Sequence, residues 1–296
     1  MRTGKRIRAL TPNSRATRAG WLLVLPALLL ICALTLYPVA YGIWISFFNK
    51  HSFFPEQTFV GLGNYTAVFA DEEFWRSLKL GLVYSLSAIA LQLVLGIAAA
   101  LLLNEAFWGR GVVRALAIFP YVIPTVVAII VWKWLLNSQF GLVNYLLGVP
   151  VSWMGRDWIM VSLILVSVWQ FFPFVVIGVL ARLQSIPGEL YEAATVDGAG
   201  AWQRFVHVTL PQLKSVLFVI VLLRSIWMFT KFDTPWLLIQ GGGAEPYIRT
   251  LPIYTFQRTF AYYEAGRGSA MAVIMFLILV AGAALYFHFW RREEHL

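Results

Sequence analysis

The sequence contains very little charge and a single cysteine. Only 12% of its 296 residues are charged, whereas about 25% is usual for a soluble protein. Cys32 has no second cysteine with which to form an intrachain disulfide, and we expect it to be a small core residue. The sequence also has no H-E-x-x-H motif, nucleophile elbow or phosphate-binding loop, and its four histidines are not paired at metal-ligand spacing. We therefore expect no catalytic residue, no metal site and no nucleotide hydrolysis in this chain.

Long apolar runs make up most of the sequence, which is 60% hydrophobic. About 20 helical residues are needed to cross a bilayer, and a spanning segment must be helical because lipid offers its backbone no hydrogen-bond partners. Six runs are long enough: 20–48, 77–103, 112–136, 159–180, 215–239 and 269–290. The sequence thus predicts an all-α polytopic membrane protein, with a basic tail over 1–19 and one six-helix domain over 20–296.

The distribution of basic residues predicts the orientation. The first 19 residues carry six arginines and lysines and no acid, whereas the loop over 49–76 is richer in acids. The positive-inside rule therefore places the N-terminus in the cytoplasm, and six spans return the C-terminus to that side. The loops over 104–111 and 181–214 are then cytoplasmic, and those over 49–76, 137–158 and 240–268 are external. The net charge of +9 is explained by this orienting tail rather than by nucleic-acid binding.

Prolines occur inside several of the predicted spans. Pro26 and Pro38 lie in the first, Pro120 and Pro124 in the third, and Pro173 in the fourth. Each proline removes a backbone donor and bends or interrupts its helix. Two interpretations stay open: ordinary kinks, or bent helices that frame a translocation path.

The cytoplasmic loop over 181–214, called the coupling loop below, contains residues typical of helix starts and helix ends. Pro187 and Glu189 are typical of a helix start, and the helix is expected to continue to Val196. Asp197-Gly198 follows as a stop, because glycine accepts the left-handed conformation found at helix ends. A second helix is expected near Ala201. The loop therefore predicts a short helix–turn–helix on the cytoplasmic face.

A spaced motif runs through this loop: Glu192-Ala193-Ala194, three residues, Gly198, nine residues, then Val208-Thr209-Leu210-Pro211. The two bare alanines allow a partner to approach the backbone closely. The motif resembles the E-A-A-x3-G-x9-I-x-L-P loop of the membrane subunits of bacterial ATP-binding-cassette (ABC) importers, with Val208 in place of the usual isoleucine. The Gly61-Leu62-Gly63-Asn64-Tyr65 run and the glycines at 241–243 are similar to those of sugar-importer permeases.

The resemblance implies an inner-membrane permease subunit of a carbohydrate importer of the maltose and glycerol-phosphate type, with type I importer architecture. It implies four kinds of partner: a second, different permease subunit, two ATPase subunits that bind the ATP and magnesium, an external binding protein, and a carbohydrate. The residues it assigns to ATPase coupling are Glu192, Ala193, Ala194, Asp197, Gly198, Leu210 and Pro211.

Polar and aromatic residues in the two spans beside the coupling loop are candidates for a substrate path. They are Ser167, Gln170, Phe171 and Phe174 in the fourth span, and Arg224, Trp227 and Lys231 in the fifth. Each set follows helical spacing and so shares one helix face. Aromatic faces and hydrogen-bond donors suit a sugar, although helix packing would explain the aromatics as well. Two cations predict an anionic sugar or polyol ester that meets Arg224 or Lys231, unless Arg224 pairs with an acid of a neighbouring subunit.

Two other functions are weighed against the importer. A secondary, ion-coupled sugar carrier would need an ion-linked acid in the spans and inverted repeats, and neither is visible. A membrane-embedded enzyme lacks the residues for its chemistry.

Overall fold

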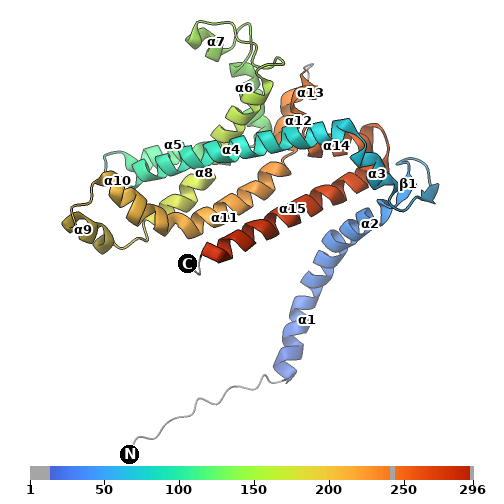
Figure 1. Cartoon of the computed structure of the whole chain (residues 1–296), viewed down its shortest axis with the longest axis horizontal. Coiled ribbons are helices and arrows are strands. Elements are labelled where there is room, and N and C mark those ends of the chain that lie inside the picture. Colours follow the sequence, from blue (N-terminus) through green and yellow to red (C-terminus); the bar gives the residue numbers. More distant parts are fainter. Residues whose placement is uncertain (1–13, 241–243, 294–296) are drawn as a thin grey trace, which may run out of the picture.

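The computed structural model describes residues 14–240 and 244–293, and most of them are helical (Figure 1). Most of the basic tail and the glycines at 241–243 lie outside these residues. The first half contains α1 (Ser14–Ile31), the π-helical turn η1 (Cys32–Leu36), α2 (Tyr37–Ile45), β1 (Phe48–Lys50), β2 (Gln57–Phe59), α3 (Gly63–Phe69), α4 (Glu72–Asn104), α5 (Arg110–Val122), α6 (Thr125–Leu135) and α7 (Leu142–Leu147). The second half contains α8 (Ile159–Leu183), α9 (Gly188–Val196), α10 (Ala201–Arg204), η2 (Phe205–Thr209), α11 (Leu210–Phe229), α12 (Asp233–Ile239), α13 (Glu245–Ile248), α14 (Leu251–Phe256), η3 (Gln257–Ala261) and α15 (Ala265–Glu293).

The centre of the molecule is formed by α4, α8 and α11, with α5 packed on α8 (Figure 1). The helix α4 is 33 residues long and is capped at its start by Asp71, whose side chain accepts a hydrogen bond from the Glu73 N–H. Such a cap satisfies a backbone donor that the first turn leaves free. The apolar core between these helices continues into α12 and α13 at one end and towards the coupling loop at the other.

Five helices are long and apolar enough to cross a membrane, and a sixth span exists only if a bent pair is counted as one; this count covers the described residues alone. The pair is α5 and α6, which meet at an angle of 100°. The third predicted span, over 112–136, is therefore interrupted, which is one of the two outcomes expected from its prolines. The break lies at Ile123-Pro124, where Ile123 is extended (ψ 130°), because a residue before proline disfavours the helical conformation.

Two other prolines are accommodated by π-helical turns rather than by breaks. The turn η1 lies directly before α2, whose first turn contains Pro38, and η2 lies directly before α11, whose first turn contains Pro211. A wider turn makes room for the proline ring, which would otherwise meet the carbonyl four residues earlier.

The fifth predicted span, over 215–239, ends at Ile239 as predicted, but it starts earlier and contains a break. Helical structure begins at Ala201, in the coupling loop, and continues through η2 and α11 to Phe229. A break over residues 230–232 then separates α11 from α12. The coupling loop is thus joined to the span by an unbroken helical segment.

The first span is not packed into the core of this chain. Every residue from 21 to 41 is exposed, and α1 points away from the other long helices (Figure 1). Cys32 is exposed as well, so the prediction that it is a core residue was wrong. Apolar side chains in a membrane span need no burial in protein, because lipid is equally apolar.

The Gly61–Tyr65 run holds the end of the first span in place. Asn64 donates hydrogen bonds of 2.8 Å to the carbonyls of Ser46 and Phe48, and the Tyr65 hydroxyl lies 2.6 Å from the Ser46 Oγ. Gly61 takes the left-handed conformation (φ +53°) that a turn can require. These residues connect α2, the β1–β2 hairpin and α3.

Candidate functional site

The first helix of the coupling loop, α9, ends in a Schellman motif. Gly198 is left-handed (φ +77°), its N–H bonds to the Thr195 carbonyl at 3.1 Å, and the Ala199 N–H bonds to the Ala194 carbonyl at 2.9 Å. This pair of hydrogen bonds satisfies carbonyls that the last helical turn leaves free. The expected stop at Asp197-Gly198 is confirmed, with Asp197 as the last residue before the left-handed glycine.

Polar contacts tie the coupling loop to the two long helices beside it. The hydroxyls of Tyr191 on α9 and Thr209 in η2 share a hydrogen bond of 3.0 Å. At the base of the loop, Arg182 at the end of α8 donates to the Gln212 backbone carbonyl at 2.9 Å and to its side-chain oxygen at 2.8 Å. These hydrogen bonds link α9 to the segment that leads into α11, and link the end of α8 to α11.

The outer face of α9 is uncovered in this chain. Glu192 and Ala193 are exposed, Ala194 is half-buried, and no residue of α9 is buried. Two apolar side chains stand beside them in solvent: Val196 is 88% exposed and Trp202 is 73% exposed. The end of the motif lies at the start of α11, where Leu210 and Pro211 are also exposed. The exposed residues of the motif are thus small, acidic and apolar. The helix α9, which carries the first part of the motif, protrudes beyond the long helices (Figure 1).

The second candidate region is a cluster of rings and cations between α5, α8 and α11. We call it the aromatic–cation cluster, and its members are Tyr121, Phe171, Phe174, Arg224, Trp227 and Lys231. The ring centroids of Phe174 and Trp227 are 5.2 Å apart, and Tyr121 lies 6.4 Å from Phe171 and 6.2 Å from Phe174. Tyr121 and Trp227 are exposed and the two phenylalanines are half-buried, so rings form the accessible surface of the cluster.

Arg224 lies beneath these rings. It is only 3% exposed, and its guanidinium carbon is 4.9 Å from the Phe171 centroid and 5.9 Å from that of Phe174. Its Nε donates to the side-chain oxygen of Gln92 at 2.9 Å, and an Nη lies 2.9 Å from the Met228 sulfur. Within the described part of the chain, no carboxylate is paired with Arg224.

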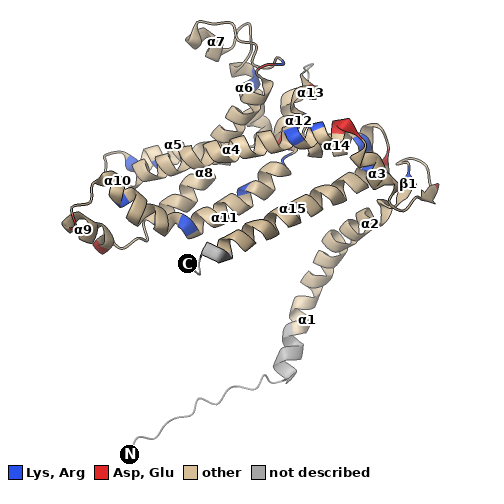
Figure 2. Ribbon diagram, viewed as in Figure 1, with Lys and Arg blue, Asp and Glu red and all other residues tan. Residues whose placement is uncertain are grey.

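Lys231 is held differently. Its ammonium group is 4.4 Å from the Phe171 centroid and forms an ion pair of 3.0 Å with Asp233. Since Asp233 balances the charge of Lys231, Arg224 is the cation of the cluster whose hydrogen-bond partners, among the described residues, are uncharged. Figure 2 shows that charged residues otherwise gather near the ends of the long helices.

Two predicted path residues do not join this cluster. Ser167 is fully buried and its hydroxyl shares a hydrogen bond of 2.8 Å with Tyr84 on α4. Gln170 is 2% exposed and donates to the Ile123 carbonyl and to the Thr125 hydroxyl at the α5–α6 break. The two residues follow the predicted helical spacing, but their side chains form hydrogen bonds with neighbouring helices instead of facing the cluster.

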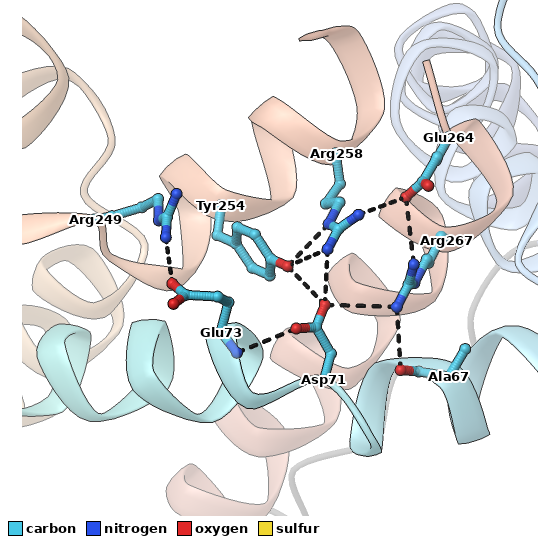
Figure 3. Close-up of polar contacts among 8 residues, drawn as sticks. All are labelled: Ala67, Asp71, Glu73, Arg249, Tyr254, Arg258, Glu264 and Arg267. Carbon is cyan, nitrogen blue, oxygen red and sulfur yellow. Dashed lines mark hydrogen bonds and ion pairs between the residues drawn. The ribbon is translucent and has the colours of Figure 1, made fainter. Parts of the chain in front are cut away.

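An ion-pair network that the sequence analysis missed joins α3 and α4 to the segment from α14 to α15 (Figure 3). Asp71 is its centre: one carboxylate oxygen accepts from the Tyr254 hydroxyl at 2.6 Å and from Arg258 at 3.0 Å, with Arg267 at 3.5 Å. The other oxygen accepts from the Glu73 N–H. Burial opposes ionisation of Asp71, but these hydrogen bonds and the two guanidinium groups outweigh it and hold the pKa of this carboxyl below its usual value.

The network extends in two directions from Asp71. Glu264 lies 3.2 Å from Arg258 and 3.7 Å from Arg267, and Arg249 pairs with Glu73. Its members are separated by nearly two hundred residues in sequence, so no local pattern identifies them. The acids of the loop over 49–76 and the bases of the loop over 240–268 give only a hint of the pairing.

The sequence matches that of known transport proteins. Residues 92–295 match the family described as binding-protein-dependent transport system inner membrane component. The trehalose/maltose transport system permease MalF of Thermococcus litoralis is 36% identical, covering 92% of this chain and 93% of that protein. The sulfoquinovosyl glycerol transport permease SmoG of Agrobacterium fabrum is 34% identical, covering 92% and 90%. A chain of a bacterial alginate ABC transporter, solved with an alginate-pentasaccharide-bound periplasmic protein, has the same fold, with a TM-score of 0.82, 23% identity and coverage of 94% and 96%.

Proposed function

Because this chain belongs to the family of binding-protein-dependent transport system inner membrane components, we propose that it is the permease subunit of an ATP-driven carbohydrate importer. The fold is that of a type I ABC importer permease. The carbohydrate class is supported by two relatives of more than 30% identity, which are named as permeases for trehalose and maltose and for sulfoquinovosyl glycerol. The ion-coupled carrier is not proposed, because neither the family nor these relatives support it.

The observation that supports an ATP-driven mechanism is that α9 is exposed and is hydrogen-bonded to the segment that leads into α11. A surface that presents Glu192 and Ala193 to solvent, and is bonded through Tyr191 to Thr209, can transmit the motion of a docked partner to α11. We infer that an ATPase subunit, holding ATP and magnesium, docks on Glu192, Ala193, Ala194, Asp197 and Gly198, with Leu210 and Pro211 at the start of α11. ATP binding then shifts a two-state equilibrium of the membrane helices.

The aromatic–cation cluster is the proposed contact surface for the carbohydrate. Phe171, Phe174 and Trp227 offer ring faces, and Lys231 is within reach of the same surface. The uncompensated charge of Arg224 favours an anionic carbohydrate or polyol ester. Ser167 and Gln170 support the path by fixing α8 against α4 and α6 rather than by meeting the substrate.

The remaining partners follow from the same proposal. A second, different permease subunit completes the path, and the exposed apolar length of α1 offers it a large surface. Two ATPase subunits and an external binding protein complete the transporter. Both termini of this chain lie on the cytoplasmic side of the inner membrane. The ion-pair network of Asp71 then lies at the external face, where the binding protein docks.

Reconstitution in vesicles tests the proposed function. The chain is co-expressed with a second permease and an ATPase subunit, and uptake of labelled trehalose and of a labelled glucuronic-acid disaccharide is measured with binding protein outside. We expect uptake that requires ATP inside and binding protein outside. Uptake that ran on an ion gradient without ATP would contradict the importer and favour a secondary carrier.

A further inference from the structure

Gln92 is a buried amide in the middle of α4 and has no part in the function proposed above. It is 0% exposed and lies among apolar residues of a membrane-spanning helix. Polar side chains in such a position are costly and are usually paired within the bundle. The side chain of Gln92 is therefore expected to have a specific partner, and the structure gives it three.

The contacts of Gln92 join three helices at one point. Its oxygen accepts from Arg224 Nε on α11 at 2.9 Å. Its Nε2 donates to the Ser167 carbonyl on α8 at 3.2 Å and lies 3.9 Å from the Met228 sulfur. Since the oxygen faces a donor and the nitrogen faces an acceptor, the two hydrogen bonds define a single orientation of the amide.

This arrangement fixes where the charge of Arg224 lies. One edge of the guanidinium is held by the Gln92 oxygen and by Met228, and its carbon stands 4.9 Å from the Phe171 centroid. The partner that holds it is an amide and carries no charge. The other cation of the cluster, Lys231, is balanced by Asp233. A full positive charge therefore remains directly beneath the ring surface, in surroundings where charges are weakly screened.

We propose that Gln92 is the residue that sets the charge preference of the substrate surface. It positions the Arg224 guanidinium beneath Phe171 and Phe174 without neutralising it, so that the surface favours carbohydrates that carry a carboxylate, sulfonate or phosphate. A glutamate at this position would accept the same hydrogen bond and cancel the charge. This inference rests on the proposed role of the aromatic–cation cluster as the carbohydrate surface.

The test compares Gln92→Glu and Gln92→Leu with the wild-type complex in lipid nanodiscs, without binding protein. The probes are a disaccharide with one glucuronic acid unit and the uncharged disaccharide of the same linkage, each titrated against tryptophan fluorescence. For the wild type we expect about tenfold tighter binding of the anionic probe. Gln92→Glu should lower that ratio to about one while changing the affinity for the neutral probe by less than about twofold. Gln92→Leu should weaken binding of both probes, because Arg224 loses its anchor.

A matched control separates this role from a general effect of added charge. Gln139 is exposed and lies outside the cluster, so Gln139→Glu should leave the ratio unchanged. An unchanged ratio in a Gln92→Glu complex that assembles and hydrolyses ATP normally would overturn the inference, and so would a wild type that imports carbohydrate without preferring the anionic probe. In both cases the proposed function survives. If ATP-dependent uptake of either carbohydrate is absent in vesicles, the proposed function itself fails.

Discussion

Gly96 on α4 faces Val175 on α8 so closely that a Cβ placed on the glycine would stand 2.5 Å from the Cβ of the valine. No real pair of non-bonded carbon atoms approaches to this distance without moving apart. The two helices share the most extensive contact in the molecule, and the absence of a side chain at Gly96 lets their backbones come together. Small residues play this part in membrane helix packing, because lipid supplies no hydrophobic force between helices.

The first prediction concerns this contact. Gly96→Leu should separate α4 from α8 and lower the midpoint of thermal unfolding in detergent, with a cost of about 1–3 kcal/mol, as for other overpacked cores. Gly282 on α15 has open space where a Cβ would stand, with no atom within 4 Å, so Gly282→Ala serves as the control and should leave the midpoint unchanged or slightly raised. Equal effects of the two variants would show that Gly96 has no special packing role.

The second prediction uses the left-handed turn that ends α9. Gly198 has φ +77° with open space around it, so conformation and not crowding limits the residues allowed there. Gly198→Val should strain the turn by about 1–2 kcal/mol and reduce ATP-dependent uptake. Asparagine tolerates this conformation, so Gly198→Asn should retain most uptake. If both variants transport equally well, the turn is not required for coupling.

The third prediction separates charge from shape on the outer face of α9. Glu192 is exposed, so its replacement does not disturb the interior of the chain. Glu192→Lys should weaken docking of the ATPase and remove most of the ATP hydrolysis that loaded binding protein stimulates, whereas Glu192→Gln should have a smaller effect. Co-purification of the ATPase subunit measures docking directly. Normal co-purification and normal stimulation of Glu192→Lys would contradict the assigned role.

The fourth prediction concerns pH. The pKa of Asp71 is lowered from 3.8 in the folded protein, so its ionised form stabilises the fold at neutral pH. That stabilisation is lost as the pH falls below about 4, towards the folded-state pKa, because protonation then removes the ion pairs with Arg258 and Arg267. Thermal unfolding measured from pH 7 down to pH 3 should show a decline in this window.

Asp71→Asn tests the same network. It should lower stability at pH 7 by about 1–3 kcal/mol, as expected when a charged hydrogen-bond acceptor is lost, and it should flatten the acid decline. Glu72, the next residue, is exposed, so Glu72→Gln is the control and should change neither quantity appreciably. A decline in Asp71→Asn as steep as in the wild type would assign the acid sensitivity to other carboxylates.

Much of the fold could be predicted from local patterns. The apolar runs place the long helices, and Gly198 marks the end of α9, since both depend on residues close together in sequence. The break at Ile123-Pro124 was indicated by the proline, but its angle of 100° was not, because neighbouring helices decide whether a proline kinks a helix or interrupts it. The exposure of Cys32 was missed for a similar reason. An apolar helix suits lipid and protein equally well.

The sequence by itself determined that this chain crosses a membrane, which loop is the candidate for coupling to a motor and which family it resembles, because hydropathy and turn chemistry are local properties. Only the tertiary structure decided which polar residues meet. It placed Ser167 against Tyr84, gave Lys231 the carboxylate of Asp233, and left Arg224 with the uncharged amide of Gln92. Helical spacing shows which residues share a face, but the partner on that face comes from another helix, and the charge balance of a buried site is set by that partner.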